Sequence, residues 1–292
     1  MAIKYRLIAF DLDETVLNHG AGPSPAVEQA LQRAHGMGCT IAVCTGRPEM
    51  LIPDSILNLP IIDHIVSANG AVVRHTSQSG PMSVVVLPHK TVKDICALAK
   101  KSRAGMQICT PAHCYMDIKS WLFMRRNMKD IDRTESFWQG WKRMRHLFTI
   151  CPSFFFKRAI KRGDVIKIIC VYKDAAACRK QMAVLANNID VEIASVMGYD
   201  IEIAAKGVTK GAMLKMLCHE IGIDKSEVFA VGDSDNDLSM RDAAGYLVAM
   251  GNASAGLKAV ADYVTEDVLR DGAASAINRF VCGLQEGEKH GT

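Results

Sequence analysis

The sequence lacks the paired cysteines, long apolar runs and repeats that mark several large classes of protein. None of its ten cysteines falls in a CxxC pair, and the closest spacings are Cys39–Cys44 and Cys109–Cys114. Most lie in apolar runs such as "TIAVC", which favours reduced core thiols over a metal site or a disulfide framework. No apolar run approaches the roughly 18 residues that a membrane span needs. These absences predict a protein that stays out of membranes.

The net charge and the first residues of the chain give no indication of a nucleic-acid partner or of secretion. The net charge is +4, which is too small to predict a nucleic-acid partner by itself. The opening "MAIKYRLIAFD" reaches charged residues too soon for a signal peptide, so a cytoplasmic location is expected. Apolar residues make up 49% of the 292, enough for a sizeable core in one large domain or two modest ones.

Short apolar segments alternate with helical patterns towards both ends of the chain. Strands are predicted for "YRLIAF", "CTIAVC", "HIVSANG", "VFAVGD" and "YLVAMG". Helices are predicted for "SPAVEQALQRAHGMG", which Ser24 can cap, and for "TKGAMLKMLCHEIGI". This alternation is typical of an α/β fold, a Rossmann-like parallel sheet with helices on both faces.

The middle of the chain has a different pattern. Helices are predicted at 91–103 and 174–187, and strands at 165–172 and near 190–204. We therefore expect a core domain formed by 1–83 and 206–292, with an inserted α+β cap domain at 84–205.

One stretch of this insert, 119–162, is basic and aromatic. It holds twelve Lys or Arg against three Asp or Glu, and all three tryptophans, Trp121, Trp138 and Trp141. Three interpretations stay open: a solvated face over packed tryptophans, a cap that attracts anionic substrates, or a patch that binds single-stranded nucleic acid. The last is the least favoured of the three.

Polar residues follow several predicted strands. They are Asp11 and Asp13, then Thr45 and Gly46, then Asp233 and Asp237, while Lys210 stands just before a helix. Ligands of parallel α/β sheets bind beyond the carboxyl ends of the strands. If the central strands are neighbours, these groups meet in one crevice.

Clustered carboxylates at a strand end are costly unless a cation neutralises them. Mg²⁺ usually takes one or two protein carboxylates, here Asp11 and Asp233, together with phosphate oxygens. The backbone carbonyl of Asp13 is a candidate third ligand. The sequence does not separate Mg²⁺ from Mn²⁺.

The remaining groups suit a phosphoryl group. The hydroxyl of Thr45 and the ammonium of Lys210 match phosphate oxygens better than a metal. Asp11 could then attack phosphorus to form an aspartyl-phosphate. Asp13, two residues on, could protonate the leaving oxygen and later activate water.

The motifs "DLDET", "TGR", "TKG" and "GDSDND", in this order, resemble the four motifs of the haloacid dehalogenase-like (HAD) superfamily. "NGA" at 69–71, "VAMGNA" at 248–253 and "ADYVTED" at 261–267 are similar to its Cof-like branch of phosphatases, which carries a type IIB cap. The resemblance covers about 1–80 and 205–283 and is weakest in the insert.

This resemblance implies a role for each matching residue. Asp11 would be nucleophile and metal ligand, and Asp13 the acid/base that also binds metal through its carbonyl. Asp233 would bind the metal. The other implied roles are phosphate binding by Leu12 N–H, Thr45, Gly46, Lys210 and Asn236, and orientation of the metal shell by Asp237.

Three further positions carry weaker expectations. Arg47 and Asn69 lie in family-like motifs, where each either contacts the ligand or fixes a loop. Position 14 is usually glycine in this family, and here it is Glu14. The Glu14 carboxylate either disfavours strongly anionic substrates or points away from the site. An extended backbone would favour the outward orientation, because successive side chains diverge on a strand.

The sequence therefore predicts a Mg²⁺-dependent phosphatase acting on a small phosphorylated metabolite: a sugar phosphate, a flavin-precursor phosphate or pyridoxal phosphate. Two alternatives stay open, a phosphomutase of the same fold and a protein that binds a phosphorylated ligand or nucleic acid without turnover. A monomer and a homodimer are equally consistent with the sequence, and no membrane partner is expected.

Overall fold

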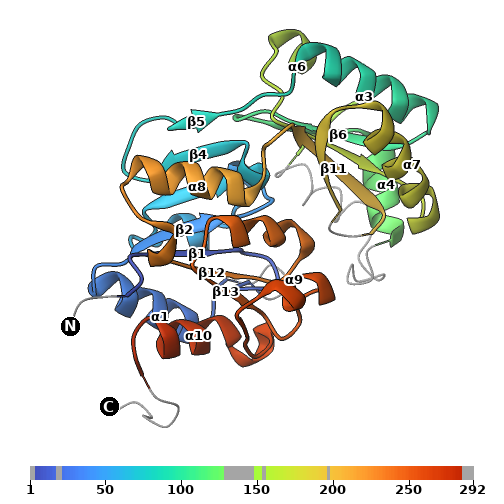
Figure 1. Cartoon of the computed structure of the whole chain (residues 1–292). Coiled ribbons are helices and arrows are strands. Elements are labelled where there is room, and N and C mark those ends of the chain that lie inside the picture. Colours follow the sequence, from blue (N-terminus) through green and yellow to red (C-terminus); the bar gives the residue numbers. More distant parts are fainter. Residues whose placement is uncertain (1–3, 18–21, 128–147, 153–155, 196–197, 285–292) are drawn as a thin grey trace. The chain divides into compact units, whose positions relative to one another are not determined.

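The computed structural model describes residues 4–17, 22–127, 148–152, 156–195 and 198–284 (Figure 1). The chain divides into two compact units. The first comprises Met1–Arg47, Ile52–Ser83 and Thr209–Thr292, and the second comprises Pro48–Leu51 and Val84–Val208.

The first unit is built on an eight-stranded sheet in the order β14-β13-β12-β1-β2-β3-β4-β5. Each pair from β14 to β3 is parallel, and β4 runs antiparallel to β3. The strands are β1 (Leu7–Phe10), β2 (Thr40–Cys44), β3 (His64–Ser67), β4 (Val72–His75), β5 (Ser83–Val84), β12 (Val228–Gly232), β13 (Tyr246–Ala249) and β14 (Tyr263–Val264). The expected α/β fold is confirmed.

Helices border this sheet, and their ends follow local sequence rules. They are α1 (Pro25–Gly36), α2 (Asp54–Leu57), α8 (Lys210–Glu220), α9 (Ala255–Val260) and α10 (Gly272–Phe280). Ser24 caps α1 by accepting from the Val27 N–H at 3.2 Å, as the sequence predicts. Thr209 caps α8 by accepting from the Ala212 N–H at 3.1 Å. That cap fixes where α8 starts and so where Lys210 lies.

The strand order determines where the functional candidates lie. β12, β1 and β2 are adjacent, and every residue of β1 and β12 is buried. Asp233, Asp11 and Thr45 each follow the last residue of one of these strands. Parallel strands end at the same edge of a sheet, so all three residues come to one edge.

The second unit holds a six-stranded sheet in the order β10-β11-β9-β6-β7-β8. Its strands are β6 (Gly105–Cys109), β7 (Cys114–Met116), β8 (Thr149–Ile150), β9 (Lys167–Val171), β10 (Val191–Ala194) and β11 (Asp200–Ala205), with helices α3 (His89–Lys101), α4 (Ile118–Asn127), α6 (Phe156–Arg162) and α7 (Ala175–Asn188). The predicted helices at 91–103 and 174–187 correspond to α3 and α7. The α+β character of the insert is confirmed, and its role as a substrate cap stays a prediction.

The basic, aromatic stretch 119–162 is described only in part. Trp121 lies on α4 with 1% of its surface exposed, so it is a core residue. Trp138 and Trp141 lie outside the described residues. All ten cysteines are free thiols, and seven are buried, as the sequence predicts.

Within the described ranges, no helix combines the length and the apolar character needed to cross a membrane.

Candidate active site

A buried lysine between two aspartates forms the centre of the site. Lys210 is fully buried at the first residue of α8, and its Nζ lies 2.8 Å from Asp11 Oδ1 and 2.7 Å from Asp237 Oδ1. Both carboxylates are themselves buried. A fully buried ammonium is stable only when paired, so two carboxylates hold Lys210 beside Asp11.

Asp237 also shapes the loop after β12. Its Oδ2 accepts hydrogen bonds from the backbone N–H groups of Asp233 (2.9 Å) and Ser234 (3.0 Å), while its Oδ1 accepts from Lys210. One carboxylate therefore fixes both the lysine and the chain that carries Asp233. The residue positions other groups through these contacts, and the orientation of a metal shell that the sequence predicts for it stays a prediction.

The site has the donor set of a divalent-cation site. Asp11, Asp233 and Asp237 each offer a carboxylate oxygen, and these oxygens lie within 4.8 Å of one another. Asp11 Oδ1 is buried and accepts no well-aligned hydrogen bond, although Lys210 lies at ion-pair distance. Clustered oxygen ligands of this kind suit a hard cation, and because Asp237 is already committed to Lys210 and the loop, Asp11 and Asp233 are the better candidates.

Burial and the charges within this cluster shift the pKa values of its own members. Burial raises the pKa of Asp11 to about 7, with Lys210 opposing the rise and Asp237 adding to it. Burial, followed by the charges of Asp11 and Asp237, raises the pKa of Asp233 to about 8. Burial alone would lower the pKa of Lys210, but its two carboxylate partners outweigh burial and raise it. Lys210 therefore keeps its charge throughout the physiological pH range.

We expect the metal-free protein to lose stability as pH rises from about 4 to about 8, between the ordinary carboxyl pKa and the raised values of Asp11 and Asp233. The folded-state pKa values of Asp11 and Asp233 lie above the ordinary value of 3.8, so the folded state binds more protons than the unfolded state across this window. Stability is then highest at the acidic end and falls as the two carboxylates are forced to ionise. The melting temperature in EDTA should fall by several degrees, and a saturating divalent cation should remove much of that fall.

Asp233→Asn is the matched control for this measurement, because it removes one of the two titrating groups. Its melting temperature should depend less on pH in EDTA and respond less to the cation. An equal pH dependence with and without cation would contradict the assignment of this cluster as a cation site.

Thr45, Gly46, Asn69 and Asn236 meet beside the carboxylates. The Asn236 amide donates to Asn69 Oδ1 at 3.2 Å, and the Asn69 N–H donates to the Thr45 carbonyl at 3.0 Å. A Cβ at Gly46 would lie 3.0 Å from Asn69 Oδ1, so the close approach of these loops favours glycine. Asn69, in a left-handed conformation with φ 59°, thus fixes the loop after β2. These contacts are of the loop-fixing kind, and a direct contact of Asn69 with a ligand stays a prediction.

Asp13 is held by Arg47. The guanidinium donates from Nε to Asp13 Oδ2 at 2.8 Å and from Nη2 to Oδ1 at 2.5 Å, a two-point contact. The side chain of Asp13 is 44% exposed, in contrast to buried Asp11, so the two aspartates of "DLDET" occupy different environments. Arg47 contacts the candidate acid/base directly, a contact that the sequence alone did not predict.

The expectation for the backbone at Glu14 was wrong. β1 ends at Phe10, and Glu14 has a φ of 55°, in the left-handed region rather than in an extended strand. Glycine adopts this region at no steric cost, which is a physical reason for the glycine that the resemblance places at this position. The Glu14 carboxylate is among the groups that raise the pKa of Asp233, so its charge reaches the site.

Two other residues bear on the site. The Leu12 N–H donates to no other described residue, while the Leu12 carbonyl accepts from Thr15, Val16 and Leu17. Thr15, which sequence reasoning missed, donates from Oγ1 to Asp233 Oδ1 at 3.4 Å. Its position in "DLDET", two residues after Asp13, is the signal that could have found it. The structure thus brings every predicted site residue of the first unit to one edge of the sheet.

Comparison with known proteins agrees with this arrangement. The family model described as haloacid dehalogenase-like hydrolase matches residues 8–277. The chain is 26% identical over 285 residues to the 5-amino-6-(5-phospho-D-ribitylamino)uracil phosphatase YwtE of Bacillus subtilis, covering 95% of this chain and 99% of that protein.

Solved structures share the fold. A haloacid dehalogenase-like hydrolase from B. subtilis superposes with a TM-score of 0.81 at 26% identity, covering 94% of this chain and 99% of that one. A HAD subclass IIB sugar phosphatase superposes with a TM-score of 0.76 at 23% identity, covering 94% and 98% of the two chains, and shows likeness of fold alone. With a family model matching nearly its whole length, the chain belongs to the haloacid dehalogenase-like hydrolases.

Proposed function

We propose that this protein is a Mg²⁺-dependent phosphatase that hydrolyses small organic phosphate monoesters through an aspartyl-phosphate on Asp11. One observation carries the proposal: a buried Asp11 lies 2.8 Å from the fully buried Lys210, beside Asp233, at the carboxyl ends of adjacent parallel strands. This arrangement sets a nucleophile, a fixed cation and a candidate metal ligand side by side. Membership in a hydrolase family and relatives named as phosphatases support it.

In this proposal, the first step transfers the phosphoryl group to Asp11. A carboxylate oxygen attacks phosphorus, the bond to the ester oxygen breaks, and Asp13 gives its proton to that oxygen. Lys210, the Leu12 N–H, Thr45, Gly46 and Asn236 would hold the phosphoryl oxygens.

In the second step Asp13 takes a proton from water, which attacks the phosphorus of the aspartyl-phosphate. Phosphate leaves and the Asp11 carboxylate is restored. Arg47 holds both oxygens of Asp13, at 2.8 and 2.5 Å, and so orients it. The protonated form needed in the first step requires this contact to loosen when substrate binds.

The donor set fits a magnesium ion held by the carboxylates of Asp11 and Asp233 and the backbone carbonyl of Asp13. Bound there, it would neutralise charge on the phosphoryl group and lower the repulsion between that group and Asp11. Asp237 would orient these ligands through its hydrogen bonds to Asp233 and Ser234.

We propose sugar phosphates, a flavin-precursor phosphate and pyridoxal phosphate as candidate substrates. The relative YwtE is named for a phosphorylated ribitylaminouracil, which supports the second candidate. The inserted unit would supply the contacts that select among them.

Release of phosphate from a generic aryl phosphate, followed by a panel of metabolite phosphates, tests the proposal. We expect turnover with Mg²⁺ or Mn²⁺ and its loss in EDTA, with the ratio of the two rates identifying the better ion. Hydrolysis of no ester in a broad panel would overturn the proposal. Movement of phosphate between positions of one sugar, without free phosphate, would identify a phosphomutase instead.

A further inference from the structure

The second unit contains a hollow of about 440 Å³ whose lining is cationic and aromatic. Its six lining residues come from the β6–β7 hairpin, from β8 and the residue after it, and from α6. They are His113, Tyr115, Thr149, Cys151, Arg158 and Arg162. None of them belongs to the candidate active site.

The two arginines give the hollow its charge. Arg158 and Arg162 lie four positions apart on α6, so they lie on the same face of the helix, and both are exposed. Among the residues that the structure describes, neither forms an ion pair with a carboxylate. Asp117, whose charge adds to burial in raising the pKa of Cys151, lies outside the lining and accepts a hydrogen bond from the Ser120 N–H.

Two rings form another part of the lining. The rings of His113 and Tyr115 have centroids 6.0 Å apart and are tilted by 58°. A planar ring of a ligand is bound more tightly when it packs against aromatic side chains of this kind. Guanidinium groups bind anionic oxygens through paired N–H donors.

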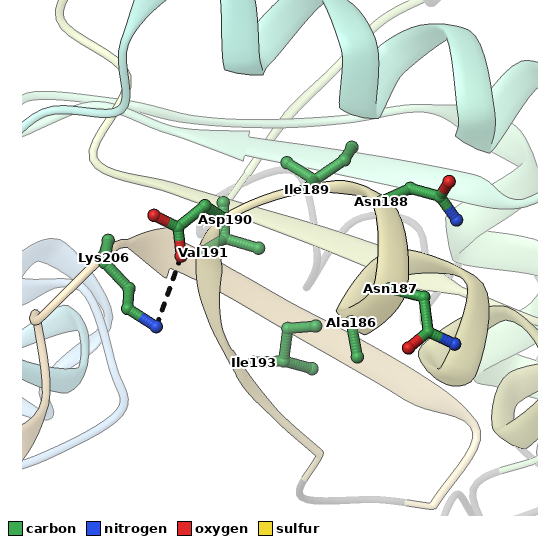
Figure 2. Close-up of a pocket in the computed structure, with 8 residues that line it drawn as sticks. All are labelled: Ala186, Asn187, Asn188, Ile189, Asp190, Val191, Ile193 and Lys206. Carbon is green, nitrogen blue, oxygen red and sulfur yellow. Dashed lines mark ion pairs between the residues drawn. The ribbon is translucent and has the colours of Figure 1, made fainter.

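A second hollow in the same unit provides a contrast. Figure 2 shows it at the end of α7 and along β10, where its lysine, Lys206, lies 3.3 Å from Asp190. The cation of that hollow is already neutralised by a carboxylate within its own lining. The hollow beside α6 differs in having two cations and no acid in its lining.

We propose that the hollow beside α6 binds a small organic anion that carries a planar ring, with Arg158 and Arg162 on the anionic group and His113 and Tyr115 against the ring. The residues that line this hollow are not among those named for the phosphoryl chemistry at Asp11, and the proposal does not rest on the proposed function.

Naphthalene-1,5-disulfonate is a suitable probe, because it is planar, carries two permanent anions and contains no phosphate ester. Its binding to the full chain is measured by calorimetry at about 150 mM salt, where exposed charges further apart than a Debye length are screened. The double variant R158Q/R162Q should bind at least about tenfold more weakly, since it removes both charge-assisted contacts to the anionic groups.

The matched control is K157Q/K161Q, which removes the same charge from the same helix at exposed positions outside the lining. It should bind the probe within about twofold of wild type. Inorganic sulfate should bind more weakly than the ring-bearing probe. Equal losses in the two double variants would show diffuse attraction to a basic helix, and either that result or no binding to wild type would overturn the proposal.

A kinetic measurement distinguishes two possible origins of the ligand, part of the substrate or a separate effector. If the ligand is the leaving part of the substrate, R158Q/R162Q raises KM for a ring-bearing phosphate ester but not for a small aliphatic one. If it is a separate effector, R158Q/R162Q leaves both KM values unchanged while the probe still binds wild type. Since binding of the probe is measured without turnover, failure of this proposal and failure of the phosphatase proposal are distinguishable.

Discussion

Asp11→Asn is expected to reduce phosphate release by at least about 10³-fold while leaving the protein folded. The amide is a poor nucleophile, and the neighbouring groups cannot replace it: Asp237 is committed to Lys210 and two backbone N–H groups, and Asp13 is held by Arg47. The amide is similar in size to the carboxylate, so packing at the end of β1 is preserved. Initial rates with Mg²⁺ and a saturating aryl phosphate measure the effect.

A matched control separates loss of the nucleophile from loss of charge. Asp94→Asn removes a carboxylate from an exposed ion pair with Lys90 on α3, and it should change the rate by less than about twofold. Acid quenching of wild type during turnover, followed by mass spectrometry, should find a phosphoryl group on the peptide that contains Asp11. Substantial turnover by Asp11→Asn would contradict the assignment of Asp11 as nucleophile.

Much of the core could be predicted from sequence because its physical signals are local. A strand buried on both faces reads as a continuous apolar run, and β1, β2 and β12 all do so. The polar residues that follow these runs then lie at one edge of the sheet. Only the adjacency of the three strands had to be assumed, and the strand order confirms it.

The backbone around the site was harder to predict. The left-handed conformation of Glu14 has no signal in its side chain, and an extended chain was the wrong expectation. The contact between Arg47 and Asp13 joins residues 34 positions apart, and that between Asn236 and Asn69 joins residues 167 apart. Such contacts depend on how loops from different strands meet, which local patterns do not determine.

The second unit was the part of the fold that the sequence predicted least completely. Its helices α3 and α7 were predicted near their observed bounds, but β6, β7 and β8 were not predicted individually. β7 and β8 have only three and two residues, too few for an alternating pattern to be recognised. The pairing of β6 with β9 joins distant segments and creates the sheet that supports the hollow beside α6.

Lys210→Met is expected to destabilise the fold by about 3–5 kcal/mol as well as to abolish turnover. Lys210 lies within 2.8 Å of both Asp11 and Asp237, and all three side chains are buried, so its loss leaves two carboxylates without their cation. The loss should be larger at high pH, because below the raised pKa of Asp11 that carboxyl group can take up a proton instead. Denaturant unfolding in EDTA at two pH values measures both effects.

Two further variants make this prediction specific. Lys215→Met changes the same residue type at an exposed position of the same helix, so it should shift stability by no more than about 0.5 kcal/mol. The double variant K210M/D11N should recover roughly half of the loss, because it removes one of the two unpaired charges and leaves Asp237 with its backbone donors. If K210M were no more destabilising than K215M, the buried cation would not be what holds these carboxylates together, and the electrostatic basis proposed for the site would be wrong.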